Sequence, residues 1–344
     1  MKRMIAMGIL TVLFMMILSS CGATVGTKQN QEVQDMPSHS TKIEAGESSL
    51  DHADISGRYT VDTAISDVMN DSVFGDYGRL IFPVDTGYYS GNTLGELRLT
   101  WYNNIDPDET VAITNYMKEH AAAGDTIFYD IYTEEEKEAD PAKKDTGLFF
   151  FKGNPGERFA ICNAGGAFAY VGAMQDSFPH ALELSQQGYN AFALIYRPGA
   201  QTACEDLARA IQFIFEHDEE LEVNTDGYSL WGGSAGARMA AWLGSYGTAA
   251  FGAGDFPQPA AVIMQYTGLS EYSEGDPATF VTVGENDGIA SWRIMKQRLD
   301  SMSALGIDTE FHSYPGLGHG FGLGTGTVAE GWIDEAIAFW QKQI

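Results

Sequence analysis

Residues 228–239 read Tyr228-Ser229-Leu230-Trp231-Gly232-Gly233-Ser234-Ala235-Gly236-Ala237-Arg238-Met239. An apolar run leads into Gly232-x-Ser234-x-Gly236, and small and apolar residues follow as a predicted helix. A strand, a sharp turn and a helix in this order are typical of a nucleophile elbow. Glycines on both sides of the serine fit, because Cβ atoms there would collide with the strand or the helix. An incidental serine in a glycine-rich loop has the same pattern, so the chain must also supply a base, an acid and an oxyanion site.

Short apolar runs alternate with predicted helices over most of the chain. Strands are predicted at 126–132, 147–151, 159–163, 191–196, 228–231, 260–265, 279–283 and 308–314, and helices at 107–124, 177–187, 202–217, 291–305 and 328–342. The charged segment 134–145 is predicted to be a solvated loop or helix. This alternation predicts an α/β fold with a mostly parallel central sheet and helices on both faces. In such sheets the ligand site lies beyond the carboxyl ends of the strands.

The first 54 residues are predicted to lie outside the fold. Lys2 and Arg3 precede an uncharged apolar run at 4–18, which is shorter than the roughly 20 residues of a membrane span. The run ends in Leu18-Ser19-Ser20-Cys21-Gly22, which resembles the lipobox of bacterial lipoproteins. The resemblance implies a signal peptide at 1–20, a lipidated Cys21 and export to the bacterial cell membrane, with 21–54 as a flexible tether. An ordinary signal peptide or a short uncleaved anchor is the alternative.

The chain is strongly acidic, with 47 acidic and 20 basic residues and a formal net charge of -27. This balance excludes nucleic acid and anionic lipid surfaces as expected partners, because phosphates require a basic footprint. Two cysteines remain besides Cys21, namely Cys162 and Cys204. Both lie in apolar runs, which favours two buried thiols over a disulfide. No spacing of residues suggests a metal site.

Residues 55–125, called the N-terminal extension below, precede the alternating pattern and are predicted to pack on the domain at 126–344. The part before 102 is rich in glycine and aromatic residues and is predicted to form loops and short strands. Tyr88, Tyr89 and Trp101 are candidates for the wall of a substrate pocket. Ordinary packing against the sheet is the alternative for each of them.

Two loops that follow predicted strands carry candidate site residues. Asn163-Ala164-Gly165-Gly166 comes after the strand that ends at 162, and its small residues would let a substrate approach backbone N–H groups. Gly284-Glu285-Asn286-Asp287-Gly288 follows the strand that ends at 283. Asp287 is the preferred acid, because an acid here can hold a histidine in the right tautomer. Glu285 is the close competitor, and Asp276 and Asp255 are weaker ones.

The candidate base is His319, which lies in the glycine-rich loop 315–322 after the last predicted strand. His312 is a strand residue with a poorer claim. The other histidines are interpreted as tether, surface or capping residues; they are His39, His52, His120, His180 and His217. The order Ser234, Asp287, His319 is the nucleophile–acid–base order of α/β-hydrolases, and it differs from the orders of chymotrypsin-like and subtilisin-like enzymes.

From about residue 126 to 344 the chain resembles an α/β-hydrolase of the esterase/lipase group. It is similar to the bacterial acetyl-esterase and xylan-esterase-like members, which carry an HGGG-type loop and a GxSAG elbow. Asn163 and Ala164 stand where that loop has His and its first Gly. The resemblance implies an oxyanion hole from the N–H groups of Gly165, Gly166 and Ala235. Arg197 and Asp206 lie in a stretch that is similar to the same group, where an ion pair between them is a hypothesis.

The resemblance implies a serine hydrolase that cleaves carboxylic esters through an acyl-enzyme, with no cofactor and no metal. No long insertion for a helical cap stands between 264 and 279. The expected substrates are small or polysaccharide-linked esters with short, acetyl-type acyl groups. Two alternatives remain: a serine peptidase of the prolyl-oligopeptidase type, and a non-catalytic lipoprotein that binds glycan or cell-wall fragments.

Overall fold

The computed structural model describes residues 57–102 and 105–344. The predicted signal peptide, the lipidated Cys21 and the tether at 21–54 lie outside the described residues, as do His39 and His52. The described residues belong to one compact unit that begins at Ile55. None of the helices in these residues is long and apolar enough to span a membrane.

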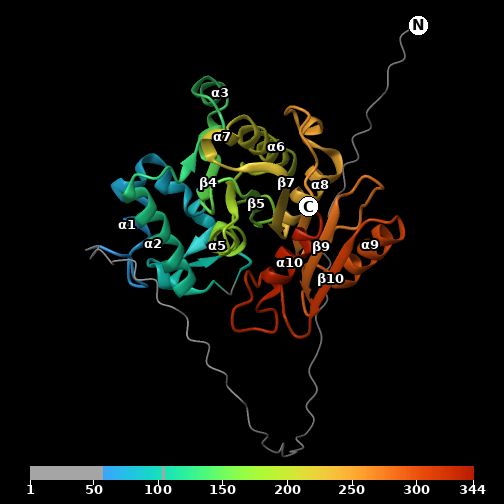
Figure 1. The fold of residues 1–344 in the computed structure, drawn as a ribbon. Helices are drawn as coiled ribbons and strands as arrows, with labels where there is room; N and C mark the ends of the chain where they lie inside the picture. Colours follow the sequence, from blue (N-terminus) through green and yellow to red (C-terminus); the bar gives the residue numbers. More distant parts are fainter. Residues whose placement is uncertain (1–56, 103–104) are drawn as a thin grey trace, which may run out of the picture. The chain divides into compact units, whose positions relative to one another are not determined.

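An eight-stranded sheet forms the centre of the fold, with the strand order β10-β9-β8-β7-β5-β6-β4-β3 (Figure 1). The strands are β3 Phe128–Tyr129, β4 Gly147–Phe151, β5 Arg158–Asn163, β6 Asn190–Ile195, β7 Asn224–Gly233, β8 Ala261–Gln265, β9 Ala278–Gly284 and β10 Thr309–Tyr314. All pairings are parallel except those of β4 with β3 and β6. The mostly parallel sheet predicted from the apolar runs is confirmed.

Helices cover both faces of this sheet. The longer ones are α2 Pro107–Ala123, α5 Phe178–Gln186, α6 Ala200–Glu216, α8 Ala235–Tyr246, α9 Trp292–Ala304 and α10 Trp332–Gln341; the shorter ones are α1 Ile65–Met69, α3 Glu134–Ala139, α4 Ala173–Asp176 and α7 Asp218–Leu221. The connections β5–α5–β6 and β6–α6–β7 run in opposite directions along the sheet. Because such crossovers are right-handed, α5 and α6 lie on opposite faces. α8 packs beside α6, and α10 packs beside α5 through Trp332 and His180.

The reversal of direction at β5 creates the place for a ligand site. β6 lies on one side of β5 and β7 on the other, so the loops after β5 and β7 leave the sheet at a topological switch point. Asn163, the last residue of β5, is in register with Gly232 near the end of β7. The glycine-rich loop after β5 therefore lies beside the turn that carries Ser234.

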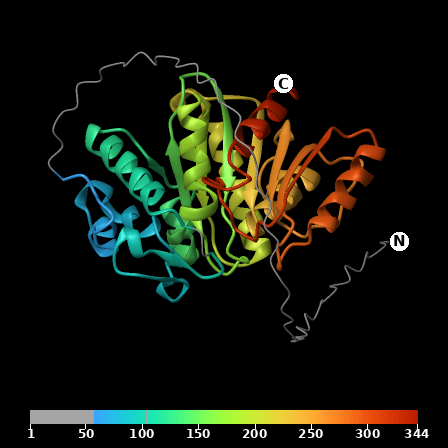
Figure 2. The ribbon, with the colours of Figure 1, turned by 90° about the horizontal axis from the view of Figure 1, so that it is seen from below.

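The N-terminal extension packs against the β3–β4 end of the sheet. It contains α1, α2, the 3₁₀ helices η1 Ser72–Leu80, η2 Thr86–Tyr88 and η3 Leu94–Glu96, and a two-stranded sheet of β1 Tyr89–Ser90 and β2 Arg98–Leu99. Tyr77 of η1 stacks on Phe128 with ring centroids 5.0 Å apart, and Tyr116 of α2 stacks on Phe151 at 5.2 Å. Figure 2 shows these blue and teal elements at one end of the sheet and the orange elements of β9, α9 and β10 at the other.

Several boundaries differ from the predicted ones. β3 covers only Phe128–Tyr129 instead of 126–132, and α10 begins at Trp332 instead of 328. The N-cap of α10 is Gly331 with φ 88°, a left-handed conformation that a continuous helix cannot contain. The charged segment at 134–145 forms α3 and the 3₁₀ helix η4 Pro141–Asp145, and a capping box between Thr133 and Glu136 starts α3.

Both remaining cysteines are buried free thiols, as predicted. Cys162 lies in β5 and Cys204 in α6. Burial raises the pKa of both thiols, that of Cys204 to about 12, so neither is a ready nucleophile. Within the described residues, His, Cys, Asp and Glu side chains form no group that could hold a metal ion.

Candidate active site

Ser234 stands on a strained turn between β7 and α8. Its φ of 52° and ψ of -112° are unusual for a residue with a side chain. A Cβ atom on Gly236 would lie 2.0 Å from the backbone oxygen of Asn163, and one on Gly232 would lie 2.3 Å from the carbonyl carbon of Gly236. Both glycines are therefore required for the turn, for the reason that the sequence pattern suggested.

The structure brings Ser234, Asp287 and His319 together. His319 Nε2 lies 3.1 Å from Ser234 Oγ, and His319 Nδ1 lies 2.7 Å from Asp287 Oδ2. The Asp287 side chain is fully buried, and its Oδ1 accepts the N–H groups of Ile289 and Ala290 at 2.7 Å each. With Nδ1–H donating to the carboxylate, Nε2 is left to accept the serine proton. This is the geometry of a nucleophile, a base and an orienting acid.

The competing acids and the competing histidine lie away from Ser234. Glu285 and Asp255 are exposed. Asp276 is buried and pairs with Arg298 at 2.9 Å. His312 pairs with glutamates of β10 and α10. The preference for Asp287 and His319 over these residues therefore agrees with the geometry.

The loop after β5 departs from the expected oxyanion arrangement at Gly165. Its N–H donates to the carboxylate of Asp176 at 3.0 Å, so this donor is already occupied. The N–H groups of Gly166 and Ala235 have no hydrogen-bond acceptor in the described part of the chain. Gly165 is nevertheless close to the nucleophile, because a Cβ atom on it would lie 2.9 Å from Ser234 Cβ. The N–H groups of Gly166 and Ala235 are therefore available as oxyanion donors, whereas the N–H of Gly165 is not.

Asn163, which stands where the related loop has His, holds strands together. Its Nδ2 donates to the backbone oxygens of Trp231 at 2.8 Å and Ile161 at 3.2 Å. The side chain is fully buried between β5 and β7. Its effect on the site is thus to fix the ends of these two strands.

Asp176 is the site residue that sequence reasoning missed. It ends α4 and is buried, and it accepts hydrogen bonds from the hydroxyls of Tyr102 and Tyr266 besides the N–H of Gly165. The one available signal was an acid inside the otherwise uncharged run 167–179. Tyr102 was also missed, and its ring lies 6.4 Å from the ring of His319.

Buried amides and an indole hold the loop that carries His319. Gln175 Nε2 donates to the oxygen of Gly320 at 3.1 Å, while Gln265 Nε2 and Trp332 Nε1 donate to the oxygen of Gly322 at 2.8 and 3.1 Å. The rigid support explains how a glycine-rich loop can hold a base in place.

One histidine was placed wrongly. His180, predicted to be a surface or capping residue, is 2% exposed, because its face of α5 packs on Trp332 of α10. Burial lowers the pKa of His180 to about 4, so its ring is neutral near pH 7.

Aromatic residues of the N-terminal extension lie beside the loop after β5. The ring of Tyr88 stacks on Tyr170 with centroids 4.7 Å apart, and the 48% exposed Trp101 lies 5.8 Å from Tyr170. Tyr89 packs on Phe82 instead. Tyr88 and Trp101 therefore contact Tyr170, which follows the loop at 163–166, whereas no ring contact of Tyr89 with Tyr170 is found in the described residues.

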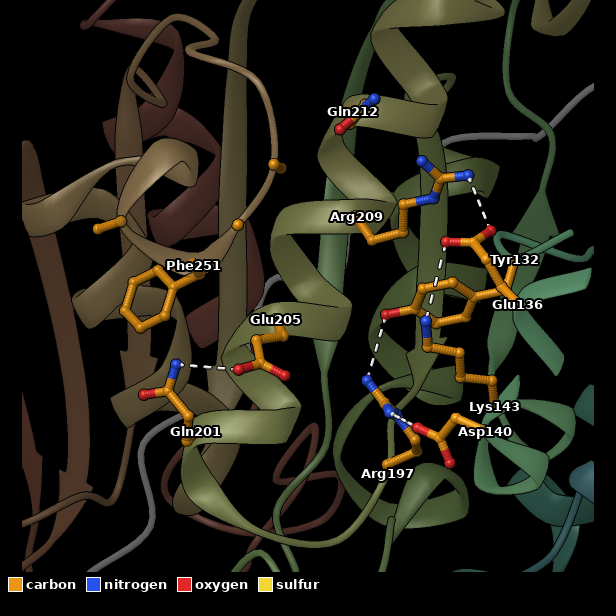
Figure 3. A pocket seen from close by; sticks show the side chains of 13 residues that line it. Tyr132, Glu136, Asp140, Lys143, Arg197, Gln201, Glu205, Arg209, Gln212 and Phe251 are labelled. Carbon is orange, nitrogen blue, oxygen red and sulfur yellow. Dashed lines mark hydrogen bonds and ion pairs between the residues drawn. The ribbon is translucent and has the colours of Figure 1, made fainter. Parts of the chain in front are cut away.

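A cavity of about 490 Å³ lies along α6, between α3 with η4 on one side and the 3₁₀ helix η5 Thr248–Phe251 on the other (Figure 3). Arg197 lies in its wall, bound to Asp206 at 2.7 Å and to Asp140 at 2.6 Å, which confirms the hypothetical Arg197–Asp206 pair. The cavity contains no member of the Ser234, Asp287 and His319 group. This cavity is therefore separate from the candidate active site at Ser234.

Comparisons with known proteins agree with this architecture. The family model described as BD-FAE matches residues 155–258, which include the loop after β5 and the turn at Ser234. The acetyl ester-xyloside bifunctional hydrolase of Caldicellulosiruptor lactoaceticus aligns with a TM-score of 0.55 and 19% identity, over 62% of this chain and 95% of its own. A sugar hydrolase of Lactococcus lactis aligns with a TM-score of 0.50 and 21% identity, over 58% and 94%. No curated protein sequence gives a significant match.

Proposed function

This chain has the α/β-hydrolase fold, and from that premise we propose that it is a serine hydrolase that cleaves carboxylic esters. The observation that carries the proposal is the position of His319, whose two ring nitrogens contact Ser234 and Asp287. A hydroxyl within reach of a base that is itself held by a buried carboxylate is the arrangement that activates serine.

The proposed reaction has two halves. Ser234 Oγ attacks the ester carbonyl while His319 Nε2 takes its proton, and Asp287 stabilises the imidazolium. The N–H groups of Gly166 and Ala235 donate to the oxygen that becomes negative. The alcohol leaves with the proton from His319, which yields the acyl-enzyme. A water molecule then gives its proton to His319 and attacks the acyl group. His319 returns this proton to Ser234 Oγ as the bond to the acyl group breaks, which releases the acid and restores the serine.

We expect short, acetyl-type acyl groups on small or polysaccharide-linked esters. The described residues between β8 and β9 contain no helix that could form a cap over the site. The Caldicellulosiruptor neighbour is an acetyl ester hydrolase, and the proposal for this chain names the same acyl class. The proposal also includes lipidation at Cys21 and attachment to the bacterial cell membrane, on the strength of the lipobox-like sequence alone.

The non-catalytic lipoprotein is the second candidate, and a reactive serine distinguishes the two. A binding protein has no need of a strained serine beside a histidine that is held by a buried acid. The prolyl-oligopeptidase alternative is less favoured, because the described residues upstream of β3 form helices and one two-stranded sheet but no β-propeller.

The test is hydrolysis of p-nitrophenyl esters from acetate to octanoate by the chain from Gly22 onward. We expect the highest kcat/KM with acetate and at least a 10⁴-fold lower kcat in Ser234→Ala, as nucleophile removal causes in other serine hydrolases. Ser303→Ala, an exposed serine on α9, is the matched control and retains full activity. Equal turnover by the wild type and Ser234→Ala would refute the assignment, and no labelling by a fluorophosphonate would favour the binding protein.

A further inference from the structure

We infer that Asp176 is a positioning residue that fixes two loops: residues 163–166, called the oxyanion loop below, and residues 315–322, which carry His319. The inference rests on the proposed function and adds to it a residue outside the Ser–His–Asp group. Asp176 accepts three hydrogen bonds, and each donor belongs to a different part of the site.

Asp176 is an unusual buried acid, because it forms no ion pair in the described part of the chain. Its residue is 1% exposed, and none of the ion pairs found in 57–102 and 105–344 includes it. The buried acids Asp206 and Asp276 each have an arginine partner. Burial raises the pKa of the Asp176 carboxyl, and the hydrogen bonds that it accepts oppose this rise. A buried carboxylate without an ion-pair partner stays charged only where hydrogen-bond donors are held against it. The same hydrogen bonds fix the positions of those donors.

The first donor is an N–H group of the oxyanion loop. Asp176 Oδ2 accepts the N–H of Gly165 at 3.0 Å, which fixes the peptide group just before the free N–H of Gly166. The carboxyl also touches the backbone before the nucleophile, since a Cβ atom on Gly233 would lie 2.7 Å from it. Donors aimed in advance at the developing oxyanion are what lower the barrier in acyl transfer.

The other two donors connect Asp176 with the His319 loop. The hydroxyl of Tyr266 donates to Asp176 Oδ1 and accepts the N–H of Gly322 at 3.3 Å. The Tyr266 ring lies 5.0 Å from the ring of His319. Burial and the nearby carboxylate raise the pKa of Tyr266 far above its ordinary value, so its hydroxyl remains a donor.

Tyr102 of the N-terminal extension completes the connection. Its hydroxyl donates to Asp176 Oδ2 at 2.6 Å, and its ring packs on the backbone next to His319, since a Cβ atom on Gly320 would lie 2.5 Å from Tyr102 Cδ1. One buried carboxylate thus links the oxyanion loop, the base loop and the N-terminal extension.

The test compares Asp176→Asn with Asp276→Asn, which removes the charge of a buried acid that contacts no site residue. The asparagine keeps the size of Asp176 but has one oxygen for three donors. We expect Asp176→Asn to lower kcat for p-nitrophenyl acetate by about 10²-fold, as loss of an oxyanion donor does, with KM changed less than about threefold. Asp276→Asn loses thermal stability and keeps the kcat of the wild type.

A trifluoromethyl ketone, which forms a tetrahedral adduct with the serine, provides a readout that a purely structural role would leave unchanged. Its Ki rises in Asp176→Asn by the same factor as kcat/KM falls, because the adduct uses the same oxyanion donors. If Asp176→Asn does not fold, Tyr266→Phe carries the test, with an expected loss in kcat of about tenfold, the equivalent of 1.4 kcal/mol.

The outcomes separate this inference from the proposed function. An active wild type and an inactive Ser234→Ala, together with an unchanged kcat and Ki in a folded Asp176→Asn, would overturn the role of Asp176 alone. A wild type without esterase activity would overturn the proposed function first. A folded Tyr266→Phe with the kcat of the wild type would likewise contradict the connection to the His319 loop.

Discussion

At the scale of single residues, the sequence pattern indicated the site residues in loops after predicted strands. It did not indicate those whose place in the site depends on contacts in the folded chain. Ser234, Asp287 and His319 could be found because each stands in a glycine-rich turn or loop after a predicted strand. Asp176 and Tyr102 could not, since they are 74 positions apart and meet only in the folded chain. The role of Gly165 was misassigned for the same reason, because its N–H is occupied by a residue that the pattern does not reveal.

The Arg197–Asp206 pair is a residue-scale feature with a predictable energy. Asp206 is fully buried and accepts four bonds of Arg197 and the hydroxyl of Tyr132 at 2.6 Å. Removing one partner of a buried pair leaves an uncompensated charge, so we expect Asp206→Ala to lower the free energy of unfolding by about 3–5 kcal/mol.

Urea denaturation followed by tryptophan fluorescence measures this loss. Glu216→Ala, an exposed acid at the end of the same helix α6, changes the free energy by less than about 0.5 kcal/mol. A loss in Asp206→Ala that is no larger than in this control would mean that the pair contributes nothing to stability.

At the scale of elements, long apolar or periodic segments were predicted well and short ones were not. β5, β6, β8 and β9 are buried on both faces and read as continuous apolar runs. β3 lies at the edge of the sheet and pairs with β4 over two residues only, so the strand predicted at 126–132 was too long. The four-residue α4, which positions Asp176, is too short for any periodicity.

The tight turn between β7 and α8 leads to a prediction about the effect of one added methyl group at Gly236. The Cβ atom of Gly236→Ala would lie 2.0 Å from the backbone oxygen of Asn163, so α8 or the end of β5 must move. We expect kcat to fall at least 10²-fold even in the folded fraction, because about 1 Å of displacement at Ser234 has that effect.

Gly247→Ala, at the end of the same helix, is the matched control for this variant. Gly247 has φ 75° and ψ 165° but no atom within 4 Å of the added Cβ, so the variant loses about 1–3 kcal/mol of stability through backbone strain and keeps its kcat. Circular dichroism and p-nitrophenyl acetate turnover measure both effects, and a Gly236→Ala variant with the kcat of the control would show that the turn tolerates side chains.

At the scale of the whole molecule, the N-terminal extension is part of the hydrolase unit. The resemblance in sequence begins near residue 126. The sequence predicted that the extension packs on the core and offered Tyr88, Tyr89 and Trp101 for a pocket wall, but it did not indicate Tyr102. The structure shows Tyr102 bonded to Asp176 and Tyr88 stacked on Tyr170. These contacts depend on packing between segments that are far apart in the chain, which composition alone does not specify.

The stability of the whole unit should depend on pH through the half-buried Glu109 and the buried His180, whose contributions have opposite signs. Burial raises the pKa of Glu109 to about 7, and burial lowers the pKa of His180 to about 4. The protonated Glu109 stabilises the fold at low pH, and this contribution is lost as pH rises from about 4.5 through 7. The neutral His180 stabilises the fold above pH 6.5, and this contribution is lost as pH falls toward 4.

Variants at these two positions separate the two opposing contributions to the pH dependence of stability. The effect of the chain's net charge of -27 is nearly the same in variant and wild type, so it cancels in the difference. Between pH 5 and 8, Glu109→Gln gains stability relative to the wild type by about 2–3 kcal/mol, because a shift of one pKa unit is worth 1.36 kcal/mol. His180→Gln shows the opposite pH dependence: its stability relative to the wild type increases as pH falls from 7 to 4. Urea unfolding at each pH measures both differences. Curves for Glu109→Gln and the wild type that run parallel from pH 5 to 8 would contradict the raised pKa of that carboxyl.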